Sequence, residues 1–296
     1  MSVGVVGRLG VIGTVAVAAA ALFASGAEAA VRQVRHYVAL GDSFTSGPLI
    51  PLPRLNPLGC ARSTENYPSL LNRRIRPGRF TDISCGAADS THMTEPQSVP
   101  LGRNPAQFSA LTKDTDLVTV SIGGNDFSVF GDTISTCARL RPSDPGGAPC
   151  AKHFGDELSK RIGQTEGRVL TVLRGIRERS PKARVLVVGY PRIAPASGTC
   201  PSVLPFATGD YPFLDSVEQQ LNAALRRAAG ANGDTFVDTY APSLHHDACK
   251  PRGVAWVNGQ HIDLLAAAPY HPFRTGMVGV ADAVQRALTT AKARRG

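Results

Sequence analysis

The sequence is poor in aromatic residues, which make up 6% of its 296 positions and include a single tryptophan. It is nevertheless basic, with 32 Lys and Arg against 23 Asp and Glu, and a formal net charge of +9. Nucleic-acid-binding surfaces combine clustered basic residues with aromatic side chains on which bases stack. Here the basic residues are scattered and no aromatic platform is interleaved with them, which argues against nucleic acid as a partner. A dispersed basic surface instead favours anionic lipid interfaces or acidic cell-wall polymers.

A long apolar run is also missing, except near the N-terminus. Arg8 precedes an uncharged apolar stretch from Val11 to Ala24, and Ala27-Glu28-Ala29 follows with small residues. This is the arrangement of a secretory signal peptide, so we expect residues 1–29 to be removed by cleavage near Ala29. A membrane anchor is the alternative, but the run is short for a span of ~20 residues and no later stretch approaches that length. The mature protein is therefore expected to be secreted.

The six cysteines contain no Cys-x-x-Cys pair, and their wide spacing argues against a metal site. An even number of cysteines behind an export signal is typical of a disulfide framework, although six cysteines allow fifteen pairings. Sequential pairing is the simplest hypothesis: Cys60 with Cys85, Cys137 with Cys150, and Cys200 with Cys249. We expect neither a metal nor a cofactor.

No repeat, Gly/Ser linker or break in composition divides residues 30–296, so we predict a single domain. Strand-like and helix-like segments alternate along it, which is typical of a parallel sheet covered by helices on both faces. The predicted strands are Val34–Leu40, Phe80–Ser84, Leu117–Ile122, Ala183–Val188 and Thr235–Val237. The predicted helices are Tyr67–Arg74, Pro105–Leu111, Phe154–Arg179, Phe213–Ala229 and Gly276–Lys292.

Short polar blocks lie where an acyl-transfer site would need them. Gly41-Asp42-Ser43 follows the first strand, Cys85-Gly86-Ala87-Ala88 the second and Gly123-Gly124-Asn125-Asp126 the third, while Tyr270-His271-Pro272 precedes the last helix. Acyl transfer requires a nucleophile, a base and donors at the developing oxyanion. Ser43 can be the nucleophile and His271 the base, with Ser43 N–H, Gly86 N–H and the Asn125 amide as donors. Each block alone could equally be turn or cap chemistry.

Together and in this order, the four blocks resemble those of the SGNH, or GDSL, hydrolase superfamily, over the whole mature chain and including its six cysteines. The resemblance is strongest to secreted actinobacterial esterases, lipases and phospholipases, which share the sequence around His246-Asp247-Ala248-Cys249 and Trp256. It implies a flavodoxin-like three-layer α/β/α sandwich with a central parallel sheet. It also implies that Ser43 is the nucleophile, that Gly86 and Asn125 are oxyanion donors, and that His271 is the base.

One position departs from the family pattern. Most members carry an aspartate three residues before the histidine, but this chain has Ala268 there. The imidazole still needs an acceptor to fix its tautomer. A main-chain carbonyl of Ala268 or Pro269 can supply it, as some secreted actinobacterial relatives do. Asp263 is a weaker candidate because it lies eight residues before the histidine.

The sequence therefore predicts a secreted serine ester hydrolase with a Ser–His dyad. The apolar run Leu49-Ile50-Pro51-Leu52 after the nucleophile favours an ester or lipid substrate with an acyl chain, as in a lipase, esterase or phospholipase. A carbohydrate O-acetyl esterase is the alternative within the class. A catalytically silent lipid- or cell-wall-binding module is the alternative outside it. We expect a monomer that makes transient contact with a lipid interface.

Overall fold

The computed structural model describes residues 1–4 and 33–293. The chain divides into Met1–Arg32 and Gln33–Gly296, and the helices and strands described here all lie in the second unit. The expected signal peptide and its cleavage near Ala29 fall outside the described residues. Within the described residues, every helix is too short or too polar to cross a bilayer.

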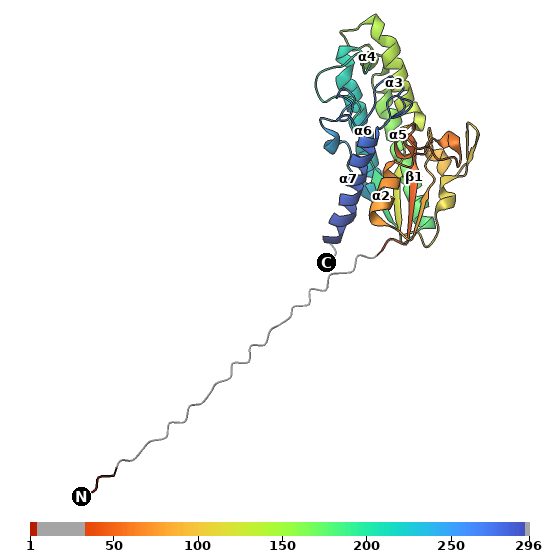
Figure 1. Cartoon of the computed structure of the whole chain (residues 1–296). Helices are drawn as coiled ribbons and strands as arrows, with labels where there is room; N and C mark the ends of the chain where they lie inside the picture. Colours follow the sequence, from red (N-terminus) through yellow and green to blue (C-terminus); the bar gives the residue numbers. More distant parts are fainter. Residues whose placement is uncertain (5–32, 294–296) are drawn as a thin grey trace. The chain divides into compact units, whose positions relative to one another are not determined.

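A five-stranded parallel sheet runs through the second unit in the order β2-β1-β5-β6-β7 (Figure 1). Its strands are β1 (His36–Gly41), β2 (Arg79–Asp82), β5 (Leu117–Ser121), β6 (Arg184–Val188) and β7 (Thr235–Val237). With its strands counted along the chain, this is the 2-1-3-4-5 order of flavodoxin-like folds. A separate antiparallel hairpin pairs β3 (Gln97–Val99) with β4 (Gly102–Asn104).

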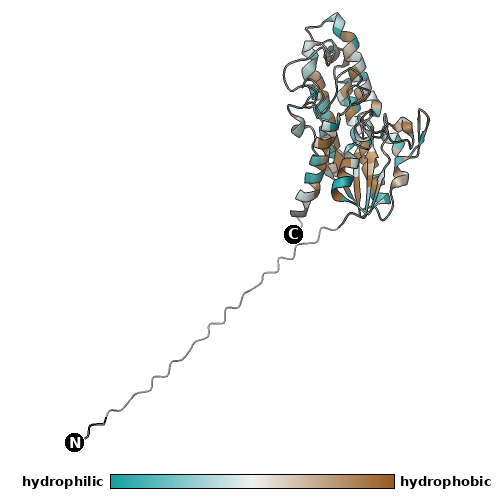
Figure 2. Cartoon of the chain, viewed as in Figure 1, coloured by the Kyte–Doolittle hydropathy of each residue, from teal (hydrophilic) through white to brown (hydrophobic). Residues whose placement is uncertain are grey.

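Helices cover both faces of the sheet, because alternate residues of each buried strand point to opposite sides. In β1, Val38 and Leu40 pack in one hydrophobic cluster, and Tyr37 and Ala39 pack in the other. The first cluster includes the buried sides of α3 (Val129–Leu140), α5 (Glu157–Arg179) and α6 (Tyr211–Ala231). The second includes α2 (Tyr67–Ile75) and α7 (Arg274–Ala293). The predicted three-layer α/β/α sandwich is confirmed, and the sheet forms its apolar middle layer (Figure 2).

Three helical predictions were wrong or incomplete. The helix expected over 154–179 is two helices, α4 (Pro149–Phe154) and α5, separated at Gly155, where φ is +52°. A residue far along the chain caps the start of α4: the buried Asp210 carboxylate accepts hydrogen bonds from the N–H groups of Cys150 and Ala151 at 3.1 and 2.9 Å. The segment 105–111 contains only a 3₁₀ turn, Gln107–Ala110, and α3 was not predicted.

Gln107 explains why the 3₁₀ turn is held where it is. Its fully buried amide accepts Gly41 N–H at 2.8 Å and donates to the Gly41 carbonyl at 2.9 Å, at the end of β1. The remaining 3₁₀ turns are Leu58–Cys60, Ser90–Met93, Asp126–Ser128, Arg141–Ser143, Thr208–Asp210 and Ala241–Ser243, and one further short helix is α1 (Ser43–Ser46).

The structure contains the three expected disulfides: Cys60–Cys85, Cys137–Cys150 and Cys200–Cys249. The first joins the segment after the predicted nucleophile to the segment after β2. The second links α3 to α4 across the Pro- and Gly-rich loop between them. Together they fasten loops at the edge of the sheet that have little apolar surface of their own.

Chain entropy predicts that the disulfides differ in their stabilising effect. Cys200 and Cys249 are 49 residues apart, and Cys137 and Cys150 are 13 apart. We expect Cys200→Ser/Cys249→Ser to lower the free energy of unfolding by about 4 kcal/mol and Cys137→Ser/Cys150→Ser by about 3 kcal/mol. Urea unfolding of the two double variants checks this order. A larger loss for the 13-residue pair would mean that native packing, and not loop closure, dominates.

Candidate active site

The polar blocks after β1, β2 and β5 lie side by side at the carboxyl edge of the sheet. The N–H of Asp42 donates to the carbonyl of Ser121, the last residue of β5, at 3.0 Å. The N–H of Cys85, after β2, donates to the carbonyl of Gly41 at 3.0 Å. Ligands of open α/β sheets bind outside this edge.

Gly41 makes the close approach of these segments possible. Its φ of +148° is open to glycine alone, and a Cβ at this position would lie 2.5 Å from the Ser121 carbonyl oxygen. Any larger residue would therefore push β1 and the segment after β5 apart. The glycine of the block Gly41-Asp42-Ser43 is therefore required on steric grounds.

Asp42 is buried, with 1% of its surface exposed, and does more than cap α1. One carboxylate oxygen accepts Phe44 N–H at 2.9 Å, and the other accepts the Tyr190 hydroxyl at 2.6 Å. The same Tyr190 oxygen accepts the N–H of Gly124 at 2.9 Å. Burial raises the pKa of Asp42 to about 7. Tyr190 therefore links the nucleophile turn to the turn that carries Asn125.

The sequence analysis missed Tyr190. It follows β6 and begins a Pro-rich loop, and no local motif distinguishes it from an ordinary core aromatic residue. A search for short motifs of serine, glycine and asparagine would not find the Tyr190 hydroxyl, because its hydrogen-bond partner Gly124 lies 66 residues earlier in the chain.

Ser43 is the first residue of α1 and is 8% exposed. Within the described residues, neither its N–H nor its hydroxyl takes part in an internal hydrogen bond. The neighbouring N–H of Phe44, by contrast, is taken by Asp42. Ser43 thus offers one free hydroxyl and one free main-chain donor at the carboxyl edge of the sheet.

His271 is brought to the same edge by the loop before α7. Its ring lies 5.5 Å, centroid to centroid, from the ring of Phe44, the residue after Ser43. The N–H of Ala268 donates to the carbonyl of Pro48 at 3.1 Å, which fastens the histidine loop to the segment after the serine. The structure therefore brings His271 to the segment that carries Ser43, 228 positions earlier in the chain.

A main-chain carbonyl orients the His271 ring. The Pro269 oxygen lies 2.6 Å from Nδ1, so Nδ1 carries the proton and Nε2 is left as the basic nitrogen. Ala268, the other candidate, accepts the His271 main-chain N–H at 3.2 Å. Asp263 does not reach the ring: its carboxylate pairs with Arg252 at 2.8 Å and accepts Leu265 N–H at 3.2 Å. Burial lowers the pKa of His271, and the Pro269 bond only partly opposes this.

The turn after β2 differs from the sequence expectation at Gly86. Its N–H donates to the Cys60 carbonyl at 2.9 Å and is not free to meet an oxyanion. The next N–H, that of Ala87, has no partner among the described residues, and Ala87 is exposed with a left-handed φ of +58°. The Gly86 N–H is occupied because the Cys60–Cys85 disulfide brings the Cys60 carbonyl against Gly86.

Asn125 stands on the turn after β5, and its side-chain amide donates one hydrogen to the Ala88 carbonyl at 2.8 Å. The second amide hydrogen remains for a ligand. Asp126, fully buried beside it, accepts the N–H of Ser90 at 3.1 Å and also contacts the Ser90 hydroxyl and Arg168. These contacts hold the turns after β2 and β5 in fixed register.

An apolar cavity adjoins the histidine. Its lining includes Phe130, Ile193, Phe206, Leu214 and Tyr270, the residue before His271. Phe130 packs edge-on against Tyr190 at 5.1 Å and lies 5.8 Å from Phe44, so the cavity continues the aromatic cluster beside Ser43. Glu218 also lines it. Its buried carboxyl accepts the N–H groups of Ile193 and Ala194, and burial raises its pKa to about 8.

Metal-ligand geometry is lacking in the described part of the chain, where no group of three or more His, Cys, Asp or Glu side chains could hold an ion. His246 stacks on Trp256 at 5.1 Å, and its Nδ1 lies 2.7 Å from the Val254 carbonyl.

Known proteins share this sequence and arrangement. Residues 39–277 match the GDSL-like lipase/acylhydrolase family. A curated relative, Lipase 2 of Streptomyces coelicolor, is 38% identical over 261 residues, which are 86% of this chain and 85% of the relative. The structure of an extracellular lipase from Streptomyces rimosus is similar with a TM-score of 0.71 and 27% identity, over 86% of this chain and 99% of that one. A phospholipase A1 from Streptomyces albidoflavus gives 0.68 and 25%, with the same coverage.

The left-handed turn at Ala87 predicts a stabilising substitution. Left-handed φ costs a residue with a Cβ roughly 1–2 kcal/mol, and glycine loses about 0.4–1 kcal/mol more chain entropy on folding. We therefore expect Ala87→Gly to raise the free energy of unfolding by about 0.5–1 kcal/mol. Ala88→Gly is the matched control: Ala88 is fully buried and has no positive φ, so its substitution should destabilise. Equal losses for both variants in urea unfolding would contradict the assigned turn.

Proposed function

The chain belongs to the GDSL-like lipase/acylhydrolase family and is a carboxylic ester hydrolase, and from this we propose that Ser43 and His271 form its catalytic dyad. The observation that carries the proposal is a free Ser43 hydroxyl next in sequence to Phe44, whose ring packs against a histidine whose Nδ1 is held by a carbonyl. His271 Nε2 takes the proton of Ser43 as its oxygen attacks the ester carbonyl. The protonated ring then gives that proton to the departing alcohol. Water, activated by the same nitrogen, releases the acid from the acyl-enzyme.

We place the oxyanion of each tetrahedral intermediate between the N–H of Ser43, the N–H of Ala87 and the amide of Asn125. Ala87 replaces Gly86 because the Gly86 N–H is already bonded to Cys60. Preorganised donors of this kind need no rearrangement as the charge develops. The hydrogen bonds from Tyr190 to Asp42 and from Gly124 to Tyr190 support them, because they fix the turns on which Ser43 and Asn125 stand.

The substrate we propose is a lipid ester with an extended acyl chain. The cavity beside Tyr270 is lined almost wholly by apolar side chains, and Ile50 and Leu52 follow the nucleophile in an apolar loop. An acetyl group would leave this surface unused, whereas each CH₂ buried in it contributes about 0.8 kcal/mol. The names of the similar proteins, lipase and phospholipase A1, agree with this substrate class.

We also propose that the protein acts after export, as one catalytic domain that begins near residue 30. The signal-peptide pattern ending at Ala29 supports this, and so do the three disulfides, which persist in oxidising surroundings. One of the similar structures is an extracellular lipase.

The dyad predicts which side chains the reaction requires. Ser43→Ala and His271→Ala should each remove nearly all hydrolysis of p-nitrophenyl butyrate, and Ser43→Ala should also abolish labelling by a fluorophosphonate. Asp263→Asn should keep most of the activity, because Pro269 and not a carboxylate orients the ring. Loss of an orienting carboxylate lowers turnover by ~10⁴ in a serine protease triad. A comparable loss in Asp263→Asn would establish a triad instead.

The pH profile should report the buried histidine. His271 must be neutral to accept a proton, and burial lowers its pKa from the ordinary 6.5. The fall of kcat/KM on acidification should therefore have its midpoint below pH 6.5, measured with a water-soluble ester between pH 4 and 9. Asp42, whose pKa is about 7, is the competing group. A midpoint near pH 7 that disappears in Asp42→Asn would assign the fall to Asp42.

A further inference from the structure

The loop after the nucleophile reverses the usual placement of polar and apolar side chains. We call residues 48–64 the serine loop. Its Leu52 and Leu55 are 70% and 78% exposed, whereas its Arg62 is 2% exposed. Arginine is almost never fully buried without partners, and leucine is among the most often buried residues. The loop thus points charge inward and apolar groups outward.

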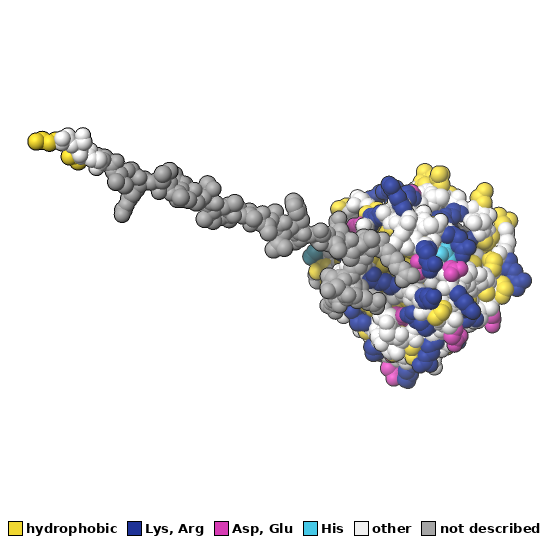
Figure 3. All heavy atoms as spheres, turned by 90° about the horizontal axis from the view of Figure 1, so that it is seen from below, with side chains coloured by type: hydrophobic (Ala, Val, Ile, Leu, Met, Phe, Trp, Pro, Cys, Tyr) yellow, Lys and Arg dark blue, Asp and Glu magenta, His cyan; other side chains and the backbone are white. Residues whose placement is uncertain are grey.

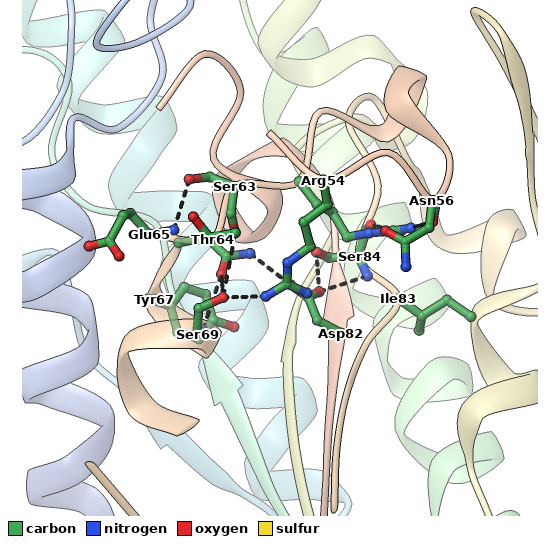
Figure 4. Close-up of polar contacts among 12 residues, drawn as sticks. Arg54, Asn56, Ser63, Thr64, Glu65, Tyr67, Ser69, Asp82, Ile83 and Ser84 are labelled. Atoms are coloured by element: carbon green, nitrogen blue, oxygen red, sulfur yellow. Dashed lines mark hydrogen bonds and ion pairs between the residues drawn. The ribbon is translucent and has the colours of Figure 1, made fainter. Parts of the chain in front are cut away.

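A polar network holds the serine loop in this orientation (Figure 4). Arg54 donates to the Asp82 carboxylate at 3.3 Å and to the Ser69 hydroxyl at 2.5 Å. Arg62 donates to the Ser84 carbonyl at 2.7 Å and also contacts the Asn56 carbonyl. The Asp82 side chain is fully buried. The leucines are therefore exposed on a firmly anchored loop, and their exposure is not a sign of loose packing.

The loop before the catalytic histidine also exposes large apolar side chains. We call residues 258–271 the histidine loop. Its Ile262, Leu264 and Leu265 are 59%, 68% and 79% exposed. Asp263, between them, is partly exposed, pairs at 2.8 Å with the exposed Arg252 and forms a backbone bridge to Ala267.

The two loops are neighbours at the entrance to the site. Ala268 N–H donates to the Pro48 carbonyl at 3.1 Å, and Ile50 and Pro51 line one groove with Leu265 and Ala266. The exposed leucines and isoleucine are thus carried by two adjoining loops, one that follows Ser43 and one that leads to His271, and together we call them the apolar rim. Soluble proteins rarely expose contiguous apolar surface without an interaction partner.

We propose that this rim, formed by Leu52 and Leu55 with Ile262, Leu264 and Leu265, inserts into the surface of a phospholipid bilayer and seats the catalytic site on it. A bilayer fits better than a second copy of the chain, because a protein seated on the rim would cover the entrance to the site. The net charge of +9 favours anionic lipid. Basic side chains are spread over the face seen from below in Figure 3. The proposal rests on the ester hydrolase function described above.

Binding can be measured without turnover by using the Ser43→Ala protein. Sedimentation with vesicles of phosphatidylcholine and phosphatidylglycerol gives a partition coefficient. Adding Leu55→Ser and Leu264→Ser should lower it by at least about tenfold, because two inserted leucines each transfer a large apolar side chain. Leu244→Ser is the matched control: Leu244 is 43% exposed and lies after the 3₁₀ turn Ala241–Ser243, outside both loops. Equal binding by the rim and control variants overturns the proposal.

Insertion itself can be seen at single positions. All six cysteines are in disulfides, so one new cysteine accepts an environment-sensitive fluorophore specifically. Labels at Leu55→Cys and Leu264→Cys should shift to the blue on addition of vesicles, and a label at Leu244→Cys should not. No shift at either rim position, or an equal shift at all three, overturns the proposal even if the serine variants fold poorly.

Two further measurements separate this proposal from its alternatives. With Ser43 present, the Leu55→Ser/Leu264→Ser protein should lose at least about tenfold in vesicle hydrolysis relative to its own turnover of p-nitrophenyl acetate. If neither the wild type nor any variant hydrolyses the soluble ester, the proposed dyad fails. The vesicle-binding result does not depend on that outcome. Gel filtration identifies the competing occupant: a wild-type dimer that the rim substitutions convert to monomer overturns lipid insertion.

Discussion

The site depends on one buried hydroxyl. Tyr190 donates to Asp42 beside the nucleophile and accepts from Gly124 beside Asn125, with both distances below 3 Å. A buried carboxyl without partners is strongly disfavoured, so Asp42 can stay in the core only while Tyr190 and the Phe44 N–H remain bonded to it. That requirement fixes the distance between two turns that follow different strands. The positions of Ser43 and Asn125 are thereby set by the core of the sandwich and not by the loops above it.

The base is oriented with less charge than in a triad. The Pro269 carbonyl fixes the tautomer of His271 as well as a carboxylate would, but it carries no full negative charge to stabilise the imidazolium. Burial lowers the pKa of His271 and so favours the neutral ring, while the hydrogen bond to Pro269 partly opposes this. The Ala268 position can therefore lack an acid without leaving the histidine free to rotate, since the loop geometry supplies the acceptor.

Apolar surface lies at two levels around the site, one inside the protein and one at its surface. Inside, the cavity beside Tyr270 extends the aromatic cluster of Phe44 and Phe130 away from the nucleophile. Outside, the serine and histidine loops expose leucines, while Arg62 of the serine loop is buried and Asp263 of the histidine loop is held in an ion pair with Arg252. A chain that must meet a water-insoluble ester needs apolar surface at both levels, because the acyl chain would otherwise have to cross water before reaching the serine.

The sequence determined the layered fold and where its candidate site residues lie along the chain. Buried parallel strands are continuous apolar runs, and a turn that follows such a strand must lie at its carboxyl edge, so Ser43 and Asn125 could be placed from local pattern alone. Only the tertiary structure decided which groups are available there. The Gly86 N–H is occupied because a disulfide brings the Cys60 carbonyl to it, whereas the next N–H, that of Ala87, has no partner among the described residues. Tyr190 acts through hydrogen bonds to Asp42 and Gly124, which lie far from it in the sequence. Whether a given N–H or hydroxyl is free depends on hydrogen bonds to distant segments of the chain, and a local sequence pattern does not predict those bonds.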